Sequence, residues 1–265
     1  MKYMGSKKRL APAITDYINN IATLENIQHY YEPFMGGCSV GELVNIKDRN
    51  LSDINKYLVA LIEKVKDDIW EYKYIEREEW YKIKEQMKEP GKYGYPDWMV
   101  GWAIFGCSWR GRPTAFGGKY IDSTTGEEVN PQEQMYNSLL KERSLLEGIN
   151  FRCCKYNELE IQNNSVIYCD APYRNTARYD YVEKFNFDEY DEWLIDKSKN
   201  NLVLISEYTM MGKQHSMFIE IANWELSKGI GAGHTDDESS IERLYYVKDG
   251  WLTDKYFNKN DDFEF

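Results

Sequence analysis

Apolar residues recur at two spacings along this chain, and each spacing predicts a different kind of element. Apolar positions three and four residues apart predict amphipathic helices over 7–21, 54–69 and 187–199. Short apolar runs that end at polar turns predict strands, and these lie at 149–154, 165–170, 201–208 and 241–250. Strands that alternate with helices favour an α/β fold built on a parallel sheet.

Two strand–helix units are predicted in the first third of the chain. Residues 27–44 predict a short strand, a glycine turn, and a helix that carries Val40, Leu43 and Val44. The second unit is a strand that ends at Asp53 and the helix after it. Parallel strands need crossover connections, which are usually helices, so both units fit a parallel sheet.

The pattern changes between residues 73 and 148, where Tyr, Trp, Lys and Gly are frequent and turn sequences interrupt the helical spacing. Near the end of this stretch, Asn130 and Pro131 have the order of an N-cap and a first helical residue. We interpret 73–148 as an inserted, largely helical subdomain. It interrupts a sheet domain made of residues 1–72 and 149–265.

The formal charge of −11 argues against a protein that coats nucleic acid without specificity. It leaves room for a local basic groove. The stretch between Trp98 and Ile121 contains Arg110, Arg112 and Lys119 and no acidic residue. Such a cluster favours contact with phosphates and bases, while a solvated surface loop is the ordinary alternative.

Cysteine and histidine usage gives no sign of a metal site. The five cysteines form no CxxC pair and the three histidines show no ligand spacing, so we expect no structural zinc. No signal peptide and no apolar run of membrane-spanning length is evident. Reduced thiols and these features favour a cytoplasmic protein.

Candidate chemistry lies where predicted strands end, because ligands of open α/β sheets bind outside the carboxyl ends of the strands. Glu32 precedes the glycine turn, and Asp53 and Asp170 end two other predicted strands. The glycines do not form GxGxxG, which argues against a nucleotide-dependent oxidoreductase. Asp53 fits a ribose ligand or the N-cap of the next helix, and both interpretations stay open.

The stretch VIYCDAPYRN at residues 166–175 is the most informative of these strand ends. An apolar run stops at an acid, and a proline and an aromatic residue come next. A plain strand-to-loop turn accounts for this order, since proline ends the ladder and Asp170 could cap the next turn. The alternative is an active-site edge that holds a carboxylate, a carbonyl and an aromatic ring together.

Five short motifs occur in an order that identifies a family. They are KYMGSK at 2–7, EPFMGG at 32–37, SDIN at 52–55, DAPY at 170–173 and ISEY at 205–208. Each motif is weak alone, but their order and the insertion between the second unit and DAPY are specific. The chain resembles Dam-like DNA adenine-N6 methyltransferases of the phage or solitary type, with DAPY in place of the usual DPPY.

The resemblance implies a Rossmann-like methyltransferase sheet that binds S-adenosylmethionine. The residues that match cofactor-contacting positions are Tyr3, Gly5, Lys7, Glu32, Pro33, Phe34, Gly36, Asp53, Tyr156 and Asp170. Those before Asp53 would surround the methionine part, Asp53 would hold the ribose hydroxyls, and Tyr156 would contact the adenine. Residues 1–72 and 149–265 would form the catalytic domain.

The insertion would be the target-recognition region, with Arg110, Arg112 and Lys119 on the DNA. The implied partner is double-stranded DNA in a prokaryotic or phage-infected cell. Neither a membrane nor an obligate protein partner is implied. The recognition sequence and a role in restriction–modification, regulation or anti-restriction are left open.

The proposed chemistry rests on the DAPY residues. The exocyclic amine of adenine is a poor nucleophile because its lone pair is conjugated into the ring. The Asp170 carboxylate and the Ala171 carbonyl could accept its two N–H groups, which turns the lone pair toward a methyl donor, while Tyr173 stacks on the base. Pro172 biases Ala171 toward extended backbone. The base must leave the duplex to reach such a site.

Two departures from the family pattern supply alternatives. Ala171 replaces a proline that would fix φ, and Lys155 replaces an acid that often precedes the aromatic residue at the cofactor adenine. A catalytically weakened or inactive relative that binds DNA and S-adenosylmethionine is therefore the main alternative. A cytosine-N4 methyltransferase is a nearer one, which the acid at Asp170 disfavours.

Overall fold

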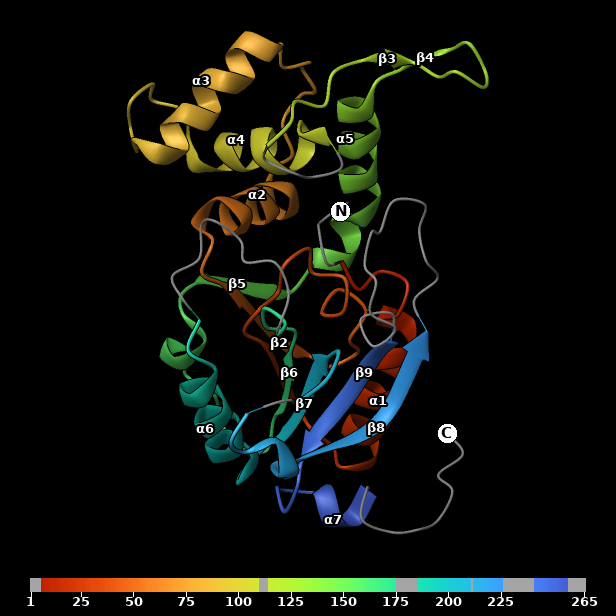
Figure 1. The fold of residues 1–265 in the computed structure, drawn as a ribbon, viewed down its shortest axis with the longest axis vertical. Coiled ribbons are helices and arrows are strands. Elements are labelled where there is room, and N and C mark those ends of the chain that lie inside the picture. Colours follow the sequence, from red (N-terminus) through yellow and green to blue (C-terminus); the bar gives the residue numbers. More distant parts are fainter. Residues whose placement is uncertain (1–5, 110–113, 175–184, 211, 226–240, 257–265) are drawn as a thin grey trace. The chain divides into compact units, whose positions relative to one another are not determined.

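The computed structural model describes residues 6–109, 114–174, 185–210, 212–225 and 241–256. They include a seven-stranded sheet of order β5-β2-β1-β6-β7-β9-β8 (Figure 1). The strands are β1 (His29–Glu32), β2 (Asp48–Asp53), β5 (Ile149–Cys153), β6 (Val166–Cys169), β7 (Leu202–Glu207), β8 (Phe218–Glu225) and β9 (Ile241–Val247). β6 pairs in parallel with β1 and β7, and β9 is antiparallel to β7 and β8. The predicted Rossmann-like α/β fold is confirmed.

Strands β6 and β7 are buried along their whole length. Parallel strands covered on both faces need continuous apolar sequence, because both sets of side chains leave water. Fully burying one Val, Leu or Ile side chain contributes about 1.5–3 kcal/mol, so Val166, Ile167 and Leu202 anchor the sheet firmly. The chain emerges from this apolar centre at Asp170.

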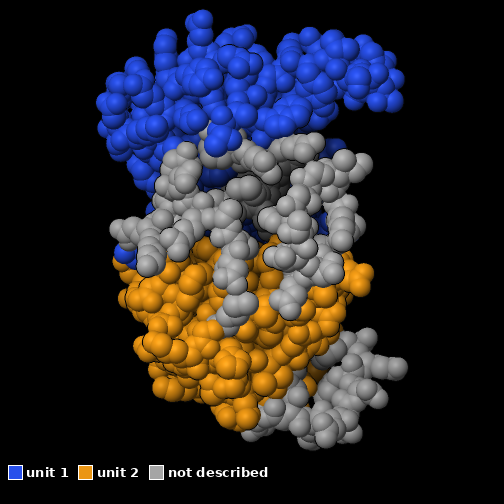
Figure 2. All heavy atoms as spheres, viewed as in Figure 1, with its two compact units in different colours: residues 1–12, 35–44, 51–155 blue, residues 13–34, 45–50, 156–265 orange. Residues whose placement is uncertain are grey.

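The chain divides into two compact units (Figure 2). Unit 1 contains residues 1–12, 35–44 and 51–155. Unit 2 contains residues 13–34, 45–50 and 156–265.

Unit 2 contains most of helix α1 (Ala11–Leu24), together with α6 (Phe187–Ser198) and α7 (Thr253–Tyr256). Short 3₁₀ turns occupy Tyr156–Glu158 and His215–Met217. On α1 the residues Ile14, Ile18 and Ile21 are fully buried, which is the stripe that the helical spacing predicts. Helix α6 packs against β7 and β9. It begins at Asn186, whose side chain accepts the N–H of Glu189.

The helices of unit 1 are α2 (Lys56–Asp67), α3 (Arg77–Lys88), α4 (Asp97–Gly101), which continues as a π-helical turn over Trp102–Gly106, and α5 (Pro131–Glu142), which a 3₁₀ turn over Arg143–Leu146 extends. Strands β3 (Tyr120–Ile121) and β4 (Glu128–Val129) form a separate antiparallel hairpin. The helices other than α2 lie between residues 73 and 148 and give that stretch its largely helical character.

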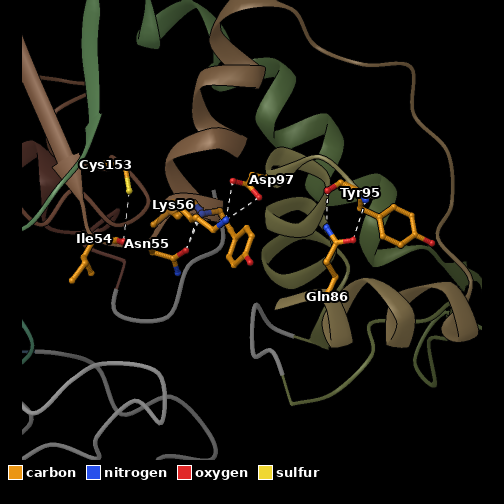
Figure 3. Close-up of polar contacts among 9 residues, drawn as sticks. Ile54, Asn55, Lys56, Gln86, Tyr95, Asp97 and Cys153 are labelled. Atoms are coloured by element: carbon orange, nitrogen blue, oxygen red, sulfur yellow. Dashed lines mark hydrogen bonds and ion pairs between the residues drawn. The ribbon is translucent and has the colours of Figure 1, made fainter. Parts of the chain in front are cut away.

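Helices α2 and α4 pack closely within unit 1. A Cβ placed on Gly101 would lie 2.1 Å from the carbonyl oxygen of Tyr57, so only glycine permits this approach. At the open end of the contact, Lys56 Nζ lies 3.1 Å from a carboxylate oxygen of Asp97 (Figure 3). Both partners of that ion pair are exposed, so packing rather than charge holds the helices together.

Most predicted elements are present. The helices predicted over 7–21, 54–69 and 187–199 correspond to α1, α2 and α6, and the four predicted strands correspond to β5, β6, β7 and β9. Asn130 caps α5 by accepting the N–H of Glu133, with Pro131 in the first turn, as predicted. Strand β8 was missed because its exposed polar residues break the apolar run, as in many edge strands.

The predicted helix that would carry Val40, Leu43 and Val44 is wrong. Residues 39–43 form hydrogen-bonded turns instead. Cys38 has a φ of +60°, which a right-handed helix does not allow, and the Leu43 N–H bonds the Val40 carbonyl three residues back.

Candidate active site

The DAPY residues come directly after the carboxyl end of strand β6, in unit 2. Its four residues are buried, and Asp170 is the first residue after it that reaches partial exposure. Ala171 is buried, while Pro172 and Tyr173 are partly exposed. A carboxyl group, a backbone carbonyl and an aromatic ring therefore succeed one another on a short segment held by a rigid strand.

Three contacts hold the Tyr173 side chain. Its hydroxyl oxygen lies 3.1 Å from Asp170 Oδ1 and also contacts the Glu242 carboxyl group on β9. Its ring meets the ring of Tyr208 edge to face, at 4.5 Å between centroids and 83° between planes. Burial raises the pKa of the Tyr173 hydroxyl well above its usual value, and the charges of Asp170 and Glu242 raise it further. Tyr173 therefore keeps its proton at neutral pH.

Arg174 fixes the backbone directly after the motif. Its guanidinium group pairs with the Asp191 carboxylate on α6, and the side chains of both residues are almost fully buried. The Arg174 backbone N–H donates to Glu207 Oε2 at 3.1 Å, at the end of β7. The guanidinium also lies 4.8 Å from the ring centroid of Phe187. Arg174 therefore links the residue after DAPY to helix α6 and to the end of β7, which lie apart from it in sequence.

Glu207 is a buried carboxyl group with an unusual titration. Burial raises the pKa of Glu207 to about 8, and Glu242 raises it too. Hydrogen bonds from the backbone N–H groups of Tyr208 and Arg174 oppose this rise, as does the Arg174 charge. Glu207 belongs to the ISEY motif at 205–208, and it lies next to the residue that comes after DAPY.

A cluster of aromatic rings lies in unit 2 beside the start of α6. Phe34 stacks on Tyr156 at 5.6 Å between centroids, with 29° between planes. Phe185, Tyr190 and Trp193 complete the cluster. Tyr190 is buried, whereas the other four rings keep partial exposure. The sequence assigned both Phe34 and Tyr156 to cofactor contact, and the structure brings these two residues together.

The strand that precedes Phe34 ends in a buried acid. Glu32 is 2% exposed and accepts the Tyr30 hydroxyl at 2.8 Å between oxygens. Pro33 is buried beside it in sequence. A carboxylate at this depth needs hydrogen-bond partners, so Glu32 is held in one orientation at the end of β1.

Asp53 and Gly36 meet within unit 1. Asp53 Oδ2 accepts the backbone N–H of Gly36 at 3.2 Å, and Oδ1 accepts that of Asn55 at 2.9 Å. Gly36 has a φ of +45°, a conformation that glycine adopts without strain. Burial raises the pKa of Asp53, and these hydrogen bonds act against that rise.

The hydrogen bonds at the start of α2 separate the two interpretations of Asp53. The N-cap of α2 is Asn55, whose side chain accepts the N–H groups of Tyr57 and Leu58 (Figure 3). Asp53 is therefore not the cap that the sequence allowed. Its carboxylate has acceptor sites for about four hydrogen bonds, and bonds from the backbone N–H groups of Gly36, Ile54 and Asn55 occupy three of them.

The other predicted site residues have varied surroundings. Lys7 is buried, and its carbonyl oxygen accepts the N–H groups of Leu10 and Ala11 at 2.7 Å. Lys119 is exposed on the hairpin, and its ammonium lies 3.1 Å from Glu128 Oε1 on β4. Tyr3, Gly5, Arg110 and Arg112 lie outside the described residues.

Sequence reasoning missed three residues that the structure places beside the DAPY segment: Asp191, Phe187 and Glu242. In the amphipathic helix α6, the sequence pattern indicates only a solvated position for the acid Asp191 and a core position for the aromatic residue Phe187. Glu242 belongs to a late strand, and nothing in its local sequence points to Tyr173. Only the pairing of β9 with β7 brings it near.

Within the described residues, no group of three or more His, Cys, Asp or Glu side chains is arranged to hold a metal ion. Among the same residues, no helix has the length and apolar character needed to cross a membrane.

These strand-end groups, a carboxylate beside a carbonyl and an aromatic ring, are suited to act on the amino group of a planar base. A family model described as D12 class N6 adenine-specific DNA methyltransferase matches residues 3–223. Because the match covers most of the chain, the protein belongs to that family. It is a DNA adenine-N6 methyltransferase, and its substrate is DNA. No curated protein matches the chain.

The titration of Glu207 gives a test of the site in the free protein. Its pKa is raised in the folded state, so between about pH 4.5 and pH 8 the folded protein keeps a proton that the unfolded chain has lost. This contribution to stability is complete below that window and is lost as the pH rises through it. Glu207→Gln removes the titration.

We therefore expect the unfolding free energy of the wild type, relative to Glu207→Gln, to fall by about 4 kcal/mol between about pH 5 and pH 9. Urea unfolding of both proteins at both pH values measures this difference in unfolding free energy. Exposed Glu192 on α6 supplies the control, because Glu192→Gln makes the same substitution away from the buried carboxyl group. An equal pH dependence in the wild type and Glu207→Gln would contradict the expectation.

Proposed function

We propose that this protein transfers a methyl group from S-adenosylmethionine to N6 of an adenine flipped out of a short site in double-stranded DNA. The observation that carries the proposal is the arrangement after β6. Asp170 and Tyr173 come after a buried parallel strand, with the Tyr173 hydroxyl 3.1 Å from Asp170 Oδ1. Family membership gives the base and the atom that is modified.

The carboxylate and the aromatic rings described above suit the proposed cofactor. Asp53 retains acceptor capacity beyond its backbone hydrogen bonds from Gly36, Ile54 and Asn55, which suits contact with the ribose. The partly exposed rings of Phe34, Tyr156 and Phe185 suit the flat face of an adenine. Glycine at position 36 leaves room beside the backbone. When bound, the cofactor would supply an electrophilic methyl group on a sulfonium sulfur.

We assign the remaining residues that match cofactor positions of the family to the methionine part of S-adenosylmethionine. Lys7, Glu32 and Pro33 would surround the methionine part together with Tyr3 and Gly5, which lie outside the described residues. Glu32 is suited to this role because its buried carboxylate favours a positively charged partner.

Asp170 and the Ala171 carbonyl would act on the adenine amine. Two acceptors on one short segment can take both N–H groups, which draws the nitrogen away from planarity and turns its lone pair outward. The acceleration then comes from positioning and electrostatics, without a covalent enzyme intermediate. Tyr173 would stack on the base, and its ring is already held on edge by Tyr208.

The position of these groups supports base flipping. Asp170 sits directly after a buried strand, so an adenine inside a duplex could not bring its amine there. Extruding one base costs about a few kcal/mol, which stacking on Tyr173 and hydrogen bonds to Asp170 would offset.

Ala171 supports a weakened enzyme as the second candidate. A proline at this position would fix φ, whereas alanine leaves it free, and Lys155 is a second departure. The acceptor carbonyl is retained, and buried Ala171 is restrained by Pro172 after it. We therefore favour a working enzyme.

We further propose that residues 73–148 recognise the DNA target. The hairpin β3–β4 exposes Tyr120 and Ile121, and Trp109 meets Tyr120 at 5.6 Å between ring centroids. Exposed aromatic and apolar side chains beside a lysine suit contact with both bases and phosphates. The predicted contacts Arg110 and Arg112 precede this hairpin in sequence.

Asp170→Ala tests the catalytic assignment. We expect methyl transfer to DNA to fall by at least about 100-fold, because the charged acceptor of the amine is lost. Calorimetry with S-adenosylmethionine should show cofactor binding within a few-fold of the wild type. Exposed Asp188 on α6 supplies a control, since Asp188→Ala should keep full activity. Transfer at the wild-type rate by Asp170→Ala would refute the assignment.

Lys119→Ala tests the DNA contact. We expect weaker DNA binding and a salt dependence of log K that is shallower by about 0.9, the value for one phosphate contact. Fluorescence anisotropy with a labelled duplex at several salt concentrations measures both. Lys82→Ala, at an exposed lysine on α3, is the matched control. An unchanged salt slope, or the same loss in both variants, would rule out this contact.

A further inference from the structure

Glu242 lies at the centre of an unusual group of carboxylates and tyrosines in unit 2. It is 2% exposed, belongs to β9, and contacts the Tyr173 hydroxyl. The same hydroxyl lies 3.1 Å from Asp170 Oδ1. Tyr173 therefore stands between two carboxyl groups, one at the end of β6 and one on a strand about seventy residues later in the sequence.

A tyrosine hydroxyl carries one proton and can make one full-strength donation. The pKa of Tyr173 is raised, so this proton stays on the ring oxygen and must be shared between Asp170 and Glu242. A hydroxyl drawn toward Glu242 is drawn away from Asp170.

The competition matters because Asp170 is the proposed acceptor of the adenine amine. A Tyr173 hydroxyl donated fully to Asp170 would take one of the carboxylate's acceptor sites and make the carboxylate a weaker acceptor for the adenine amine. The contact with Glu242 also fixes the hydroxyl end of the ring, and therefore the angle of the ring. The Tyr208 ring meets Tyr173 edge to face, so a change of ring angle would disturb that packing as well.

We propose that Glu242 is a positioning residue for methyl transfer: it engages the Tyr173 hydroxyl, weakens the donation from that hydroxyl to Asp170, and sets the angle of the stacking ring. This role rests on the proposed function of Asp170 and Tyr173. Glu242 itself touches neither the base nor the cofactor. Its position on β9 is fixed by pairing within the antiparallel β8–β9 hairpin, where it stands opposite Trp224.

The first experiment is a double-mutant cycle with kinetics. Glu242→Ala should lower kcat by about 10- to 100-fold, the range expected for a misplaced reacting group, and leave the KM for S-adenosylmethionine within about two-fold. Glu242→Gln, which can still hydrogen-bond the hydroxyl, should recover most of the loss. In a Tyr173→Phe background, Glu242→Ala should have little further effect, because no hydroxyl remains to compete for Asp170.

A merely structural Glu242 would give another result. The loss would then be the same with Tyr173 or phenylalanine at position 173, and the KM would change with kcat. Glu225→Gln serves as the control, since Glu225 is an exposed acid on the same hairpin. Independence of the Glu242 and Tyr173 substitutions would overturn the proposal.

A second measurement does not need activity. 3-Fluorotyrosine placed at position 173 gives one fluorine NMR signal in the full-length protein. Glu242→Ala should shift or broaden this signal, and Glu225→Gln should not. An unchanged signal in Glu242→Ala would overturn the proposal even in an active enzyme. If the wild type transfers no methyl group, the proposed function fails, while the fluorine signal still decides whether Glu242 holds Tyr173.

Discussion

The buried ion pair between Arg174 and Asp191 is the interaction on which the candidate active site most depends. Burying a charge costs several kcal/mol unless a partner and hydrogen bonds compensate it, and removing one partner of such a pair is strongly destabilising. The two side chains are only 7% and 2% exposed. The pair joins the residue after DAPY to helix α6, and the Arg174 N–H joins it to Glu207 on β7. The segment from Asp170 to Arg174 is therefore held at both ends.

Around this pair the sheet gathers more carboxyl groups than a core normally contains. Glu207 and Glu242 are both buried, and Asp170 is next to them through Tyr173 and Arg174. Such a group is favourable only if protons, hydrogen bonds and one positive charge together neutralise it. The raised pKa of Glu207 is one outcome of this crowding. Acceptors held this way are preorganised for an amine that enters with two N–H groups.

The helices and most strands could be predicted because their periodicity is local. The α1 stripe and the apolar runs of β6 and β7 can be read from spacing alone. The turn segment after Gly37 could not, because its apolar residues have helical spacing while Cys38 has a φ of +60°. Asp53 and Asn55 also show the limit: both residues are typical caps, and only the hydrogen bonds separate the cap from the candidate ligand.

The candidate site was predictable only in part for the same reason. Asp170 and Phe34 stood out because short motifs carry them, and Tyr156 stood out because it matches a cofactor-contacting position of the family. Glu242 and Asp191 did not, since their roles depend on pairing between strands and packing of a helix that lie far apart in sequence. Residues such as these, which contact the candidate site residues without being part of a motif, are brought there by tertiary structure, so the local sequence does not predict them.

The central claim is that the protein methylates adenine N6 with S-adenosylmethionine. The most direct test is to incubate the wild type with cofactor labelled in its methyl group and with unmethylated duplex DNA, and then to digest the DNA and identify the labelled nucleoside. We expect label in N6-methyladenine alone. Label in N4-methylcytosine, or unlabelled DNA from a protein that still binds the cofactor, would contradict the claim.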